Sequence, residues 1–213
     1  MAVSWEVIRT ERHALLGYLE TLTPQQWATP SLCEGWRVQD VAAHLAAAPA
    51  VTPGPLLADF ARAWMRPNRA TRDGAVRWAR RGTQAILDQL RRNAERDAKP
   101  PGVPRDAVLV DAVVHALDVR RPLGDHRAIP ADAFGPAADF CANTRWPASI
   151  MLGGWDRKRI AGVRLVAEDQ DWSHGEGPEV RGSGEALLLL LSGRRPLPGE
   201  LHGEGISRLD GRA

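Results

Sequence analysis

Apolar residues recur every three or four positions through most of the first 120 residues, which is the period of an amphipathic helix. Thr23 with Pro24, and a cluster of prolines around Gly54, interrupt the pattern where helices should end. Strong helix formers dominate VQDVAAHLAAA, while the last periodic stretch, RDAVLVDAVVHALDVR, keeps its helical period despite its valines. We therefore predict helices over residues 4–22, 38–48, 56–65, 72–96 and 105–120.

The last third of the chain has a different pattern. The segment IAGVRLVAED alternates and is β-branched, which predicts a strand, whereas WSHGEGPEVRG is typical of Gly-rich turns. The run EALLLLLSG predicts a short apolar helix that ends at Gly193. Together these patterns predict a mainly α fold, with a helical domain over residues 1–148 and a small α+β domain over 149–213. The boundary is expected near 145–154.

Charge and hydropathy exclude several classes of partner. The 28 basic and 26 acidic side chains leave a formal net charge of +2, too small to demand nucleic acid or an anionic membrane. No apolar stretch approaches the roughly 20 residues of a membrane span, and the first residues lack the apolar core of a signal peptide. We expect a cytoplasmic protein, and the sequence leaves its oligomeric state open. One group of arginines is interpreted as a solvated helix face, with the alternative that one or two of them turn inward and clamp substrate carboxylates: Arg62, Arg66, Arg69, Arg72, Arg77, Arg80 and Arg81.

The chain has two cysteines, Cys33 and Cys141, and they do not form a CxxC pair. This argues against a disulfide framework and against a zinc site built from cysteines. We interpret both as small buried hydrophobes. Neither is placed by the sequence beside a candidate ligand, so neither is expected to serve as a nucleophile.

Three side chains have the residue types and spacing of a metal site. Asp111 and His115 are four residues apart on one predicted helix, so their side chains project from the same face. His44 lies in an alanine-rich helix, where a polar side chain needs a specific partner. Two purely structural alternatives stay open at this point: Asp111 and His115 form a surface pair, or His44 is a core histidine satisfied by one hydrogen bond. If the three converge, they leave coordination positions open for water, thiolate or substrate.

Two stretches around these residues are similar to a known family. SLCEGWRVQDVAAHL, residues 31–45, resembles the metal-binding helix signature of mycothiol-dependent maleylpyruvate isomerases, and VDAVVHALDVRRPLG, residues 110–124, resembles their second signature. Residues 162–194 resemble the small C-terminal domain that many of these proteins carry. The resemblance therefore covers nearly the whole chain.

The resemblance implies a fold and a ligand set. The family fold is a DinB-like four-helix bundle whose divalent metal, usually zinc, would be held here by His44, Asp111 and His115. The family's isomerase has Glu where this chain has the shorter Asp111. Relatives often have Thr or Ser at the start of the second helix, where this chain has Arg37 and lacks a hydroxyl cap.

Nearby polar residues have two interpretations each. Asp40 lies one turn before His44 and either orients an imidazole or complements the helix dipole. Asp118 lies three residues after His115 and is a candidate to orient a ligand, an alternative ligand, or a partner of Arg121. Asp111 remains the preferred carboxylate ligand.

Aromatic residues and a late histidine are weaker candidates. Trp36 and Trp146 lie where they could line a pocket, although tryptophans at helix entries usually pack in the core. His174 lies in the Gly-rich segment and is expected to be structural.

The resemblance implies an enzyme that uses mycothiol: a metal-bound thiolate attacks an electrophilic small molecule, in an isomerase or an S-transferase reaction. The catalytic and substrate-binding residues of the chain stay unassigned. Two alternatives stay open, a metal-dependent hydrolase that activates water and a non-catalytic metal-binding or ligand-binding protein. The GEG and GSG pieces lack the strand-to-helix context of a phosphate loop.

Overall fold

The computed structural model describes residues 3–50, 66–100, 102–145 and 157–209, together with Gly54 and Trp64. The chain divides into two compact units, Met1–His126 and Arg127–Ala213. The division comes earlier than the boundary predicted between residues 148 and 149. That predicted boundary itself lies outside the described residues.

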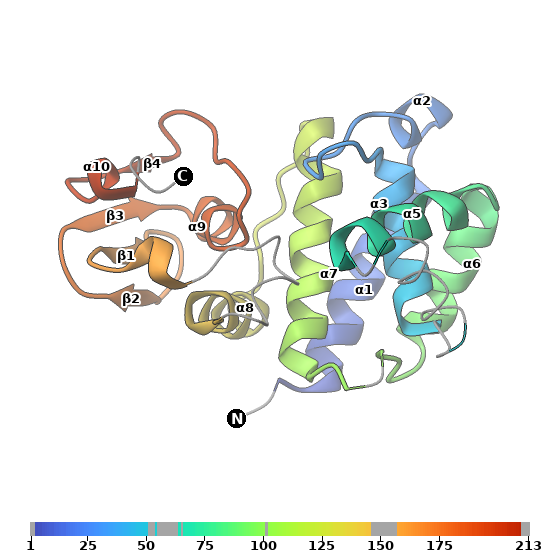
Figure 1. Cartoon of the computed structure of the whole chain (residues 1–213), viewed down its shortest axis with the longest axis horizontal. Coiled ribbons are helices and arrows are strands. Elements are labelled where there is room, and N and C mark those ends of the chain that lie inside the picture. The colour runs from blue at the N-terminus through green and yellow to red at the C-terminus, as the bar shows by residue number, and fades with distance from the viewer. Residues whose placement is uncertain are drawn as a thin grey trace. The chain divides into compact units, whose positions relative to one another are not determined.

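Four helices of the first unit form a closed bundle (Figure 1). In this bundle α1 packs on α7, α7 on α3, α3 on α6, and α6 on α1, so that each helix contacts two neighbours. Their apolar faces meet in a core that includes Leu19, Val41 and Ile86, each fully buried. The four helices are α1 (Trp5–Glu20), α3 (Val38–Ala47), α6 (Thr83–Ala94) and α7 (Arg105–Arg120).

The bundle confirms three predicted helices and corrects a fourth. Helices α1, α3 and α7 fall on 4–22, 38–48 and 105–120. The valines of α7 do not prevent the helix, because burial against its neighbours outweighs a small loss of intrinsic propensity. The helix predicted over 56–65 lies almost wholly outside the described residues.

The prediction of one helix over 72–96 was wrong. Two helices cover this stretch: α5 (Pro67–Ala79), which packs on α3, and α6. Between them Gly82 has a φ of +88°, a left-handed conformation that few other residues adopt. The backbone N–H of Gly82 donates to Ala79 O at 3.0 Å, which closes α5 before α6 begins.

Shorter elements complete the first unit. A helical turn that the sequence analysis did not predict follows Thr23, whose side chain accepts from the backbone of Gln26 in a capping box. The short elements are α2 (Pro24–Trp27), η1 (Ala48–Ala50) and η2 (Arg121–Leu123).

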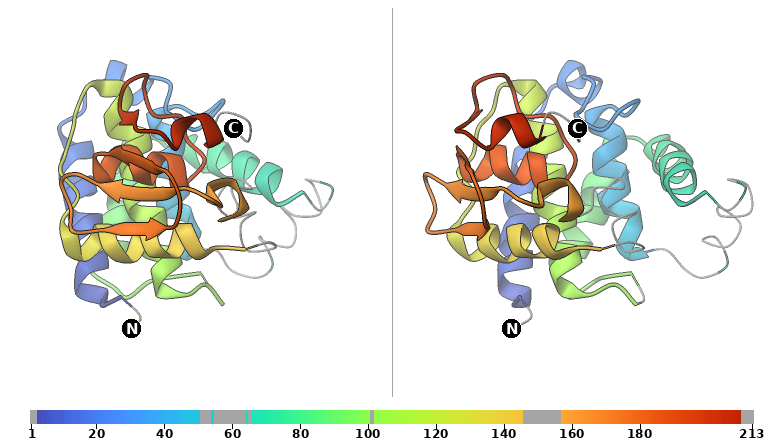
Figure 2. Two further views of the ribbon diagram at one scale, coloured as in Figure 1. Left: turned by 90° about the vertical axis from the view of Figure 1, so that its left-hand side faces the viewer. Right: turned by 60° about the vertical axis from the view of Figure 1, so that its left-hand side comes forward.

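The second unit combines a small mixed sheet with helices. The strand order is β2-β1-β3-β4, in which β1 runs parallel to β3 and antiparallel to β2, and β4 is antiparallel to β3. Helix α9 packs against β1 and β3, behind the strands in the left view of Figure 2. The elements are α8 (Ala131–Asn143), η4 (Arg157–Ile160), β1 (Arg164–Ala167), β2 (Ser173–Gly175), β3 (Glu179–Gly182), α9 (Gly184–Leu191), β4 (Leu201–His202) and α10 (Ile206–Leu209).

Two outcomes in this unit differ from the sequence analysis. The segment WSHGEGPEVRG contains β2 and β3 and is not only turn. Its glycine content reflects close packing of the strands, because a Cβ on Gly175 would lie 2.4 Å from the carbonyl oxygen of Val163. Helix α8, which was placed in the first domain, belongs to the second unit, where the ring of Phe134 lies against Gly184 at the start of α9.

The predicted fold class is confirmed: a mainly α chain, with a four-helix bundle followed by a small α+β unit. Within the described ranges no helix combines the length and the hydropathy that crossing a membrane requires. The bundle matters most for function, because the predicted ligands lie on α3 and α7, two of its packed helices.

Candidate metal centre

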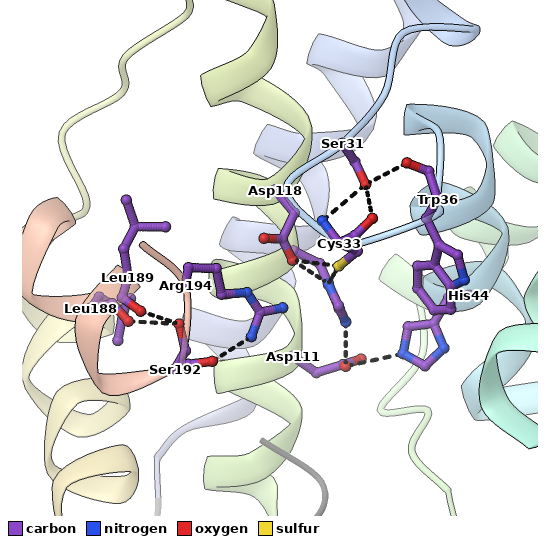
Figure 3. A network of polar contacts seen from close by, with 11 residues as sticks. Ser31, Cys33, Trp36, His44, Asp111, Asp118, Leu188, Leu189, Ser192 and Arg194 are labelled. Atoms are coloured by element: carbon purple, nitrogen blue, oxygen red, sulfur yellow. Dashed lines mark hydrogen bonds and ion pairs between the residues drawn. The ribbon is translucent and has the colours of Figure 1, made fainter. Parts of the chain in front are cut away.

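Two packed helices bring the three predicted ligands together. His44 lies in the last turn of α3, and Asp111 and His115 lie one turn apart on α7. Asp111 Oδ1 is 3.2 Å from His44 Nε2 and 3.4 Å from His115 Nε2. Each of the three residues offers one ligand atom, and these three atoms all lie within 4.8 Å of one another. Figure 3 shows the contact between Asp111 and the imidazole of His44.

These distances suit a shared metal ion. A tetrahedral ion with bonds of about 2.0–2.2 Å to nitrogen and oxygen holds its ligand atoms roughly 3.3–3.5 Å apart. The distance from Asp111 Oδ1 to His115 Nε2, 3.4 Å, lies in that range, and the distance to His44 Nε2, 3.2 Å, is slightly shorter. The donor set of two imidazoles and one carboxylate is typical of catalytic zinc sites, which keep a further position open. The residues present therefore fit a zinc ion.

His115 is held from its other ring nitrogen. Nδ1 lies 2.7 Å from Oδ2 of Asp118, whose side chain is fully buried. A carboxylate can only accept, so His115 donates from Nδ1 and leaves the lone pair of Nε2 directed to the ligand side. Carboxylate, imidazole and metal in this order are a recurrent arrangement in metal sites. Of the interpretations of Asp118, the contact supports the one in which it orients a ligand.

Cys33 is adjacent to this group, which corrects the expectation that both cysteines are buried hydrophobes away from the ligands. Its Sγ donates to Asp118 Oδ2 at 3.1 Å and lies 3.8 Å from His115 Nδ1 (Figure 3). Cys141 does match the expectation, since it is fully buried and burial raises the pKa of its thiol to about 12. The two cysteines therefore occupy very different environments.

Cys33, His115 and Asp118 also form a possible ligand group, but its geometry is that of hydrogen bonds. The 2.7 Å between His115 Nδ1 and Asp118 Oδ2 is a normal charge-assisted hydrogen bond and is short for two ligands of one ion. The short contact of Asp118 therefore marks this group as support for His115, whereas the His44 group keeps the wider spacing that a shared ion would need.

The electrostatics of Asp111 favour its ionised form. Burial alone would raise the pKa of Asp111, but the charge and hydrogen bond of His44, with His115 and Arg12, outweigh it. The net effect is a pKa of Asp111 below its ordinary value. An ionised carboxylate is the form that binds a cation.

Asp40 caps the helix that carries His44. Its Oδ2 accepts from the backbone N of Arg37 at 2.9 Å and from Arg37 Nε at 3.0 Å, while Oδ1 accepts from Arg37 Nη2 at 3.1 Å. Both oxygens are thus engaged at the start of α3. This supports the interpretation in which Asp40 complements the start of the helix. A hydroxyl at position 37 would make a different contact, because it would accept from a backbone N–H of the first turn.

Trp36 borders the site, since its ring centroid lies 5.5 Å from that of His44 and 6.3 Å from that of His115. Trp146 lies outside the described residues. His174 lies in β2 of the second unit, where its ring stacks on Trp172 at 6.0 Å. The predicted arginine group is exposed over residues 66–81, and Arg62 lies outside the described residues.

Arg12 of α1 was missed by the sequence analysis. Burial lowers the pKa of Arg12, partly offset by Asp111 and Asp97, and its guanidinium donates to the carbonyl oxygens of Asn93 and Ala98 at 3.0 and 2.7 Å. A cavity of about 30 Å³, the size of one water molecule, adjoins these groups. It is lined by Arg12, Leu15, Leu16, Leu45, Pro49, Leu90, Asn93, Val108, Asp111 and Ala112.

No pattern in the sequence places Arg12 or Cys33 at the site. Arg12 lies in a helix with other charged residues, and only the packing of α1 on α6 and α7 shows that it turns inward. Cys33 lies in a loop whose path depends on a hydrogen bond from the backbone N of Leu32 to Asp118 O, 3.2 Å long. Such long-range contacts carry no local pattern.

Comparison with known proteins places the chain in a family. The family model described as the mycothiol maleylpyruvate isomerase N-terminal domain matches residues 8–120, more than half of the chain. A crystal structure of the mycothiol-dependent maleylpyruvate isomerase has 14% sequence identity and a TM-score of 0.59, and covers 94% of this chain and 91% of its own. A histidine-to-alanine mutant of that isomerase gives 13%, a TM-score of 0.61 and the same coverage. No curated protein matches the chain. The matched residues include all three candidate ligands, and the chain belongs to the mycothiol maleylpyruvate isomerase N-terminal domain family.

Proposed function

We propose that the protein is a metal-dependent enzyme that uses mycothiol as cofactor or co-substrate in an isomerase or S-transferase reaction on an electrophilic small molecule. The observation that carries the proposal is the position of Asp111 Oδ1, 3.2 and 3.4 Å from one nitrogen each of His44 and His115. The family match over residues 8–120 supports the choice of thiol.

Each residue has a distinct task. His44, Asp111 and His115 would hold a divalent ion, in the first place zinc, through two neutral imidazoles and one carboxylate. When bound, the ion would lower the pKa of a thiol in its open position and supply a thiolate at neutral pH. Asp118 accepts the proton of His115 Nδ1 in a hydrogen bond, and the ring of Trp36 lies beside both imidazoles.

The chemistry that follows belongs to the thiol and the substrate. In an isomerisation the sulfur adds to an electron-poor double bond, the resulting single bond rotates, and the sulfur leaves with its electron pair, so the thiol is regenerated. In a transfer reaction the adduct takes up a proton and is the product. In both cases the reacting sulfur must come from a small molecule if the chain's own thiols are engaged elsewhere.

The contacts of Cys33 are consistent with an external thiol. Its Sγ lies beside Nδ1 of His115, whereas the proposed ligand atom of that ring is Nε2. The thiol donates a hydrogen bond to Asp118 and so lies on the Nδ1 side of the imidazole. Cys141 belongs to the second unit and has a raised pKa, which disfavours its thiolate.

The test combines metal analysis with thiol binding. We expect the purified protein to contain about one zinc ion per chain. Added mycothiol should increase the free energy of unfolding of the zinc-loaded protein by RT ln(1 + [L]/Kd), about 2.7 kcal/mol at a hundredfold excess over Kd, and its melting temperature should rise accordingly. The metal-free protein and His115→Ala should show a much smaller rise. Loss of an electrophilic model substrate should require both metal and thiol.

Two outcomes would overturn the proposal in different ways. Turnover that needs the metal and ignores the thiol would identify a hydrolase. Saturable binding of metal and thiol, with no turnover of any electrophile in a panel of activated alkenes and epoxides, would identify a binding protein. Cys33→Ser is the matched control, and it should keep thiol-dependent turnover because the reacting sulfur is not its own.

A further inference from the structure

Cys33 lies at the end of a chain of hydrogen bonds that leads to the candidate metal centre. Its thiol donates to Asp118 Oδ2 at 3.1 Å, and the same oxygen accepts from His115 Nδ1 at 2.7 Å. His115 Nε2 in turn lies 3.4 Å from Asp111 Oδ1. Nothing in the family match assigns a role to this cysteine.

The loop that carries Cys33 is built to hold its side chain in place. Ser31 Oγ accepts from the backbone N of Cys33 at 3.1 Å and donates to Trp36 O at 2.9 Å. The backbone N of Trp36 donates to Cys33 O at 3.0 Å, and the N of Leu32 donates to Asp118 O at 3.2 Å. The loop therefore donates two hydrogen bonds to Asp118, one to the backbone carbonyl oxygen of Asp118 and one to its carboxylate.

The buried position of Asp118 makes this second contact consequential. A fully buried carboxylate needs donors to offset its lost hydration, and His115 and Cys33 both donate to Oδ2 of Asp118. With both in place the carboxylate has one favoured orientation, and it fixes the plane and the tautomer of the His115 ring. Removing the thiol leaves the carboxylate freer to rotate away from Nδ1.

We infer that Cys33 is a positioning residue of the metal centre: its thiol orients Asp118, which orients His115 so that Nε2 faces the ion. The inference deepens the proposed function and rests on the same metal site. The role is that of a hydrogen-bond donor and not of a ligand or nucleophile. It predicts that a hydroxyl can replace the thiol and that a methyl group cannot.

The experiment measures the affinity for Zn²⁺ alone, by competition with a chromophoric chelator, in full-length variants with no added thiol. Asp118→Asn should weaken zinc binding by about 10- to 100-fold, as loss of such partners does in other zinc sites. Cys33→Ala should weaken it by about three- to tenfold, because a thiol is a weak donor. Cys33→Ser should restore most of the loss. Cys141→Ala, which removes a thiol of the second unit, is the matched control and should leave the affinity unchanged.

A double variant separates this role from a merely structural one. If Cys33 acts through Asp118, then Cys33→Ala should cost nothing further in the Asp118→Asn background, because the two losses share one pathway. Additive losses would overturn the inference. So would a Cys33→Ala variant that melts earlier without metal yet binds zinc as tightly as the wild type.

Cobalt substitution distinguishes a donor from a ligand. The Co²⁺-loaded wild type should lack a thiolate-to-cobalt charge-transfer band, since His44, Asp111 and His115 supply the ligands. Such a band in the wild type, lost in Cys33→Ser, would show that Cys33 binds the ion and would overturn the inference while leaving a metal centre in place. A wild type that binds neither Zn²⁺ nor Co²⁺ would refute the proposed function and this inference together.

Discussion

Helices α7 and α9 are both buried along most of their length, but α7 carries several polar side chains into that environment, whereas α9 has Glu185 in its first turn and is apolar beyond it. Residues 186–191 of α9 are alanine and leucine, all buried, and they contribute to the core of the second unit. In α7, by contrast, Asp118 and Arg120 are buried, and Asp111 and His115 are only partly exposed. The difference separates a helix that supplies stability from a helix that also supplies a site.

The buried polar side chains of α7 are tolerated because each makes at least one hydrogen bond, although the Nε atom of Arg120 has no such partner among the described residues. Asp118 is bonded to His115, and Arg120 pairs with Asp125 and donates to Ala14 O at 3.1 Å. A buried polar group without such a partner costs about 1–3 kcal/mol, so the sequence of α7 is constrained at more positions than that of α9. A constraint of this kind is expected where side-chain orientation matters.

The largest effects are expected when a key side chain is removed from each helix, with loss of the metal in α7 and loss of stability in α9. His115→Ala in α7, or His44→Ala opposite it, should abolish zinc binding because only two ligands remain. Leu188→Ala in α9 should lower the free energy of unfolding by about 2–5 kcal/mol, since the side chain is fully buried. Elemental analysis and denaturant unfolding check both. Zinc content unchanged in both histidine variants would remove the metal centre from the first unit.

Within α7 the two carboxylates should differ. Asp111→Asn removes a ligand and should lose far more zinc than Asp118→Asn, which removes only the support of His115. Zinc titration of the two variants, with folding checked by circular dichroism, measures the difference. The opposite order would make Asp118 the ligand and the Cys33 group the metal site.

A pH series sharpens the role of Asp111. Its lowered pKa means that the folded state binds the proton less readily than the unfolded chain does. The resulting stabilisation of the metal-free protein should be present above the ordinary pKa of Asp and be lost as pH falls through the lowered value. In Asp111→Asn this part of the acid sensitivity should disappear. An identical pH dependence of the melting temperature in both proteins would argue against the ion pairing of Asp111.

The hydrophobic pattern predicted most helices of the bundle, but not the break between α5 and α6 or the short strands of the second unit. The periodicity of α1 and α3 is clear because one face of each is apolar or small, so their bounds followed from the pattern. Helix α7 is buried on most sides, and its bounds followed instead from the prolines that flank the run, Pro104 and Pro122. The break at Gly82 was overlooked because apolar residues continue at helical spacing on both sides of it. The strands β2 and β3 are too short, and too rich in glycine, to show alternation.

The site divides in the same way. His44, Asp111 and His115 could be proposed from residue type and i, i+4 spacing, because ligands on regular helices have a predictable direction. Cys33 could not be proposed, because the direction of a side chain in a loop depends on contacts such as that of Leu32 with Asp118. Helical geometry can be read from the sequence, whereas the placement of a loop on a helix cannot.

The two cysteines offer a smaller test of the contrast between site and core. Cys141 is fully buried, and at a pKa of about 12 almost none of its thiol is ionised near neutral pH. Cys33 is partly exposed. We expect one thiol per chain to react with a disulfide reagent in the native protein and two in denaturant. Cys33→Ser should abolish the native reaction, whereas equal labelling in Cys33→Ser and wild type would place the accessible thiol at Cys141.

The smallest effect is expected at His174, and a small effect there is what we expect if the second unit supplies no metal ligand. The residue lies in β2 of the second unit, where its ring stacks on Trp172 at an interplanar angle of 11°, and Trp172 Nε1 donates to Asp139 of α8. These contacts explain the histidine as part of a surface aromatic pair, which contributes about 0.5–1.5 kcal/mol at most. His174→Ala should therefore lower the melting temperature slightly and leave zinc content at about one per chain. His174→Phe, which keeps a ring on Trp172, should recover the stability. Loss of zinc in a folded His174→Ala protein would mean that the second unit supplies a ligand, and the contrast between a helix that holds a site and a unit that holds none would fail.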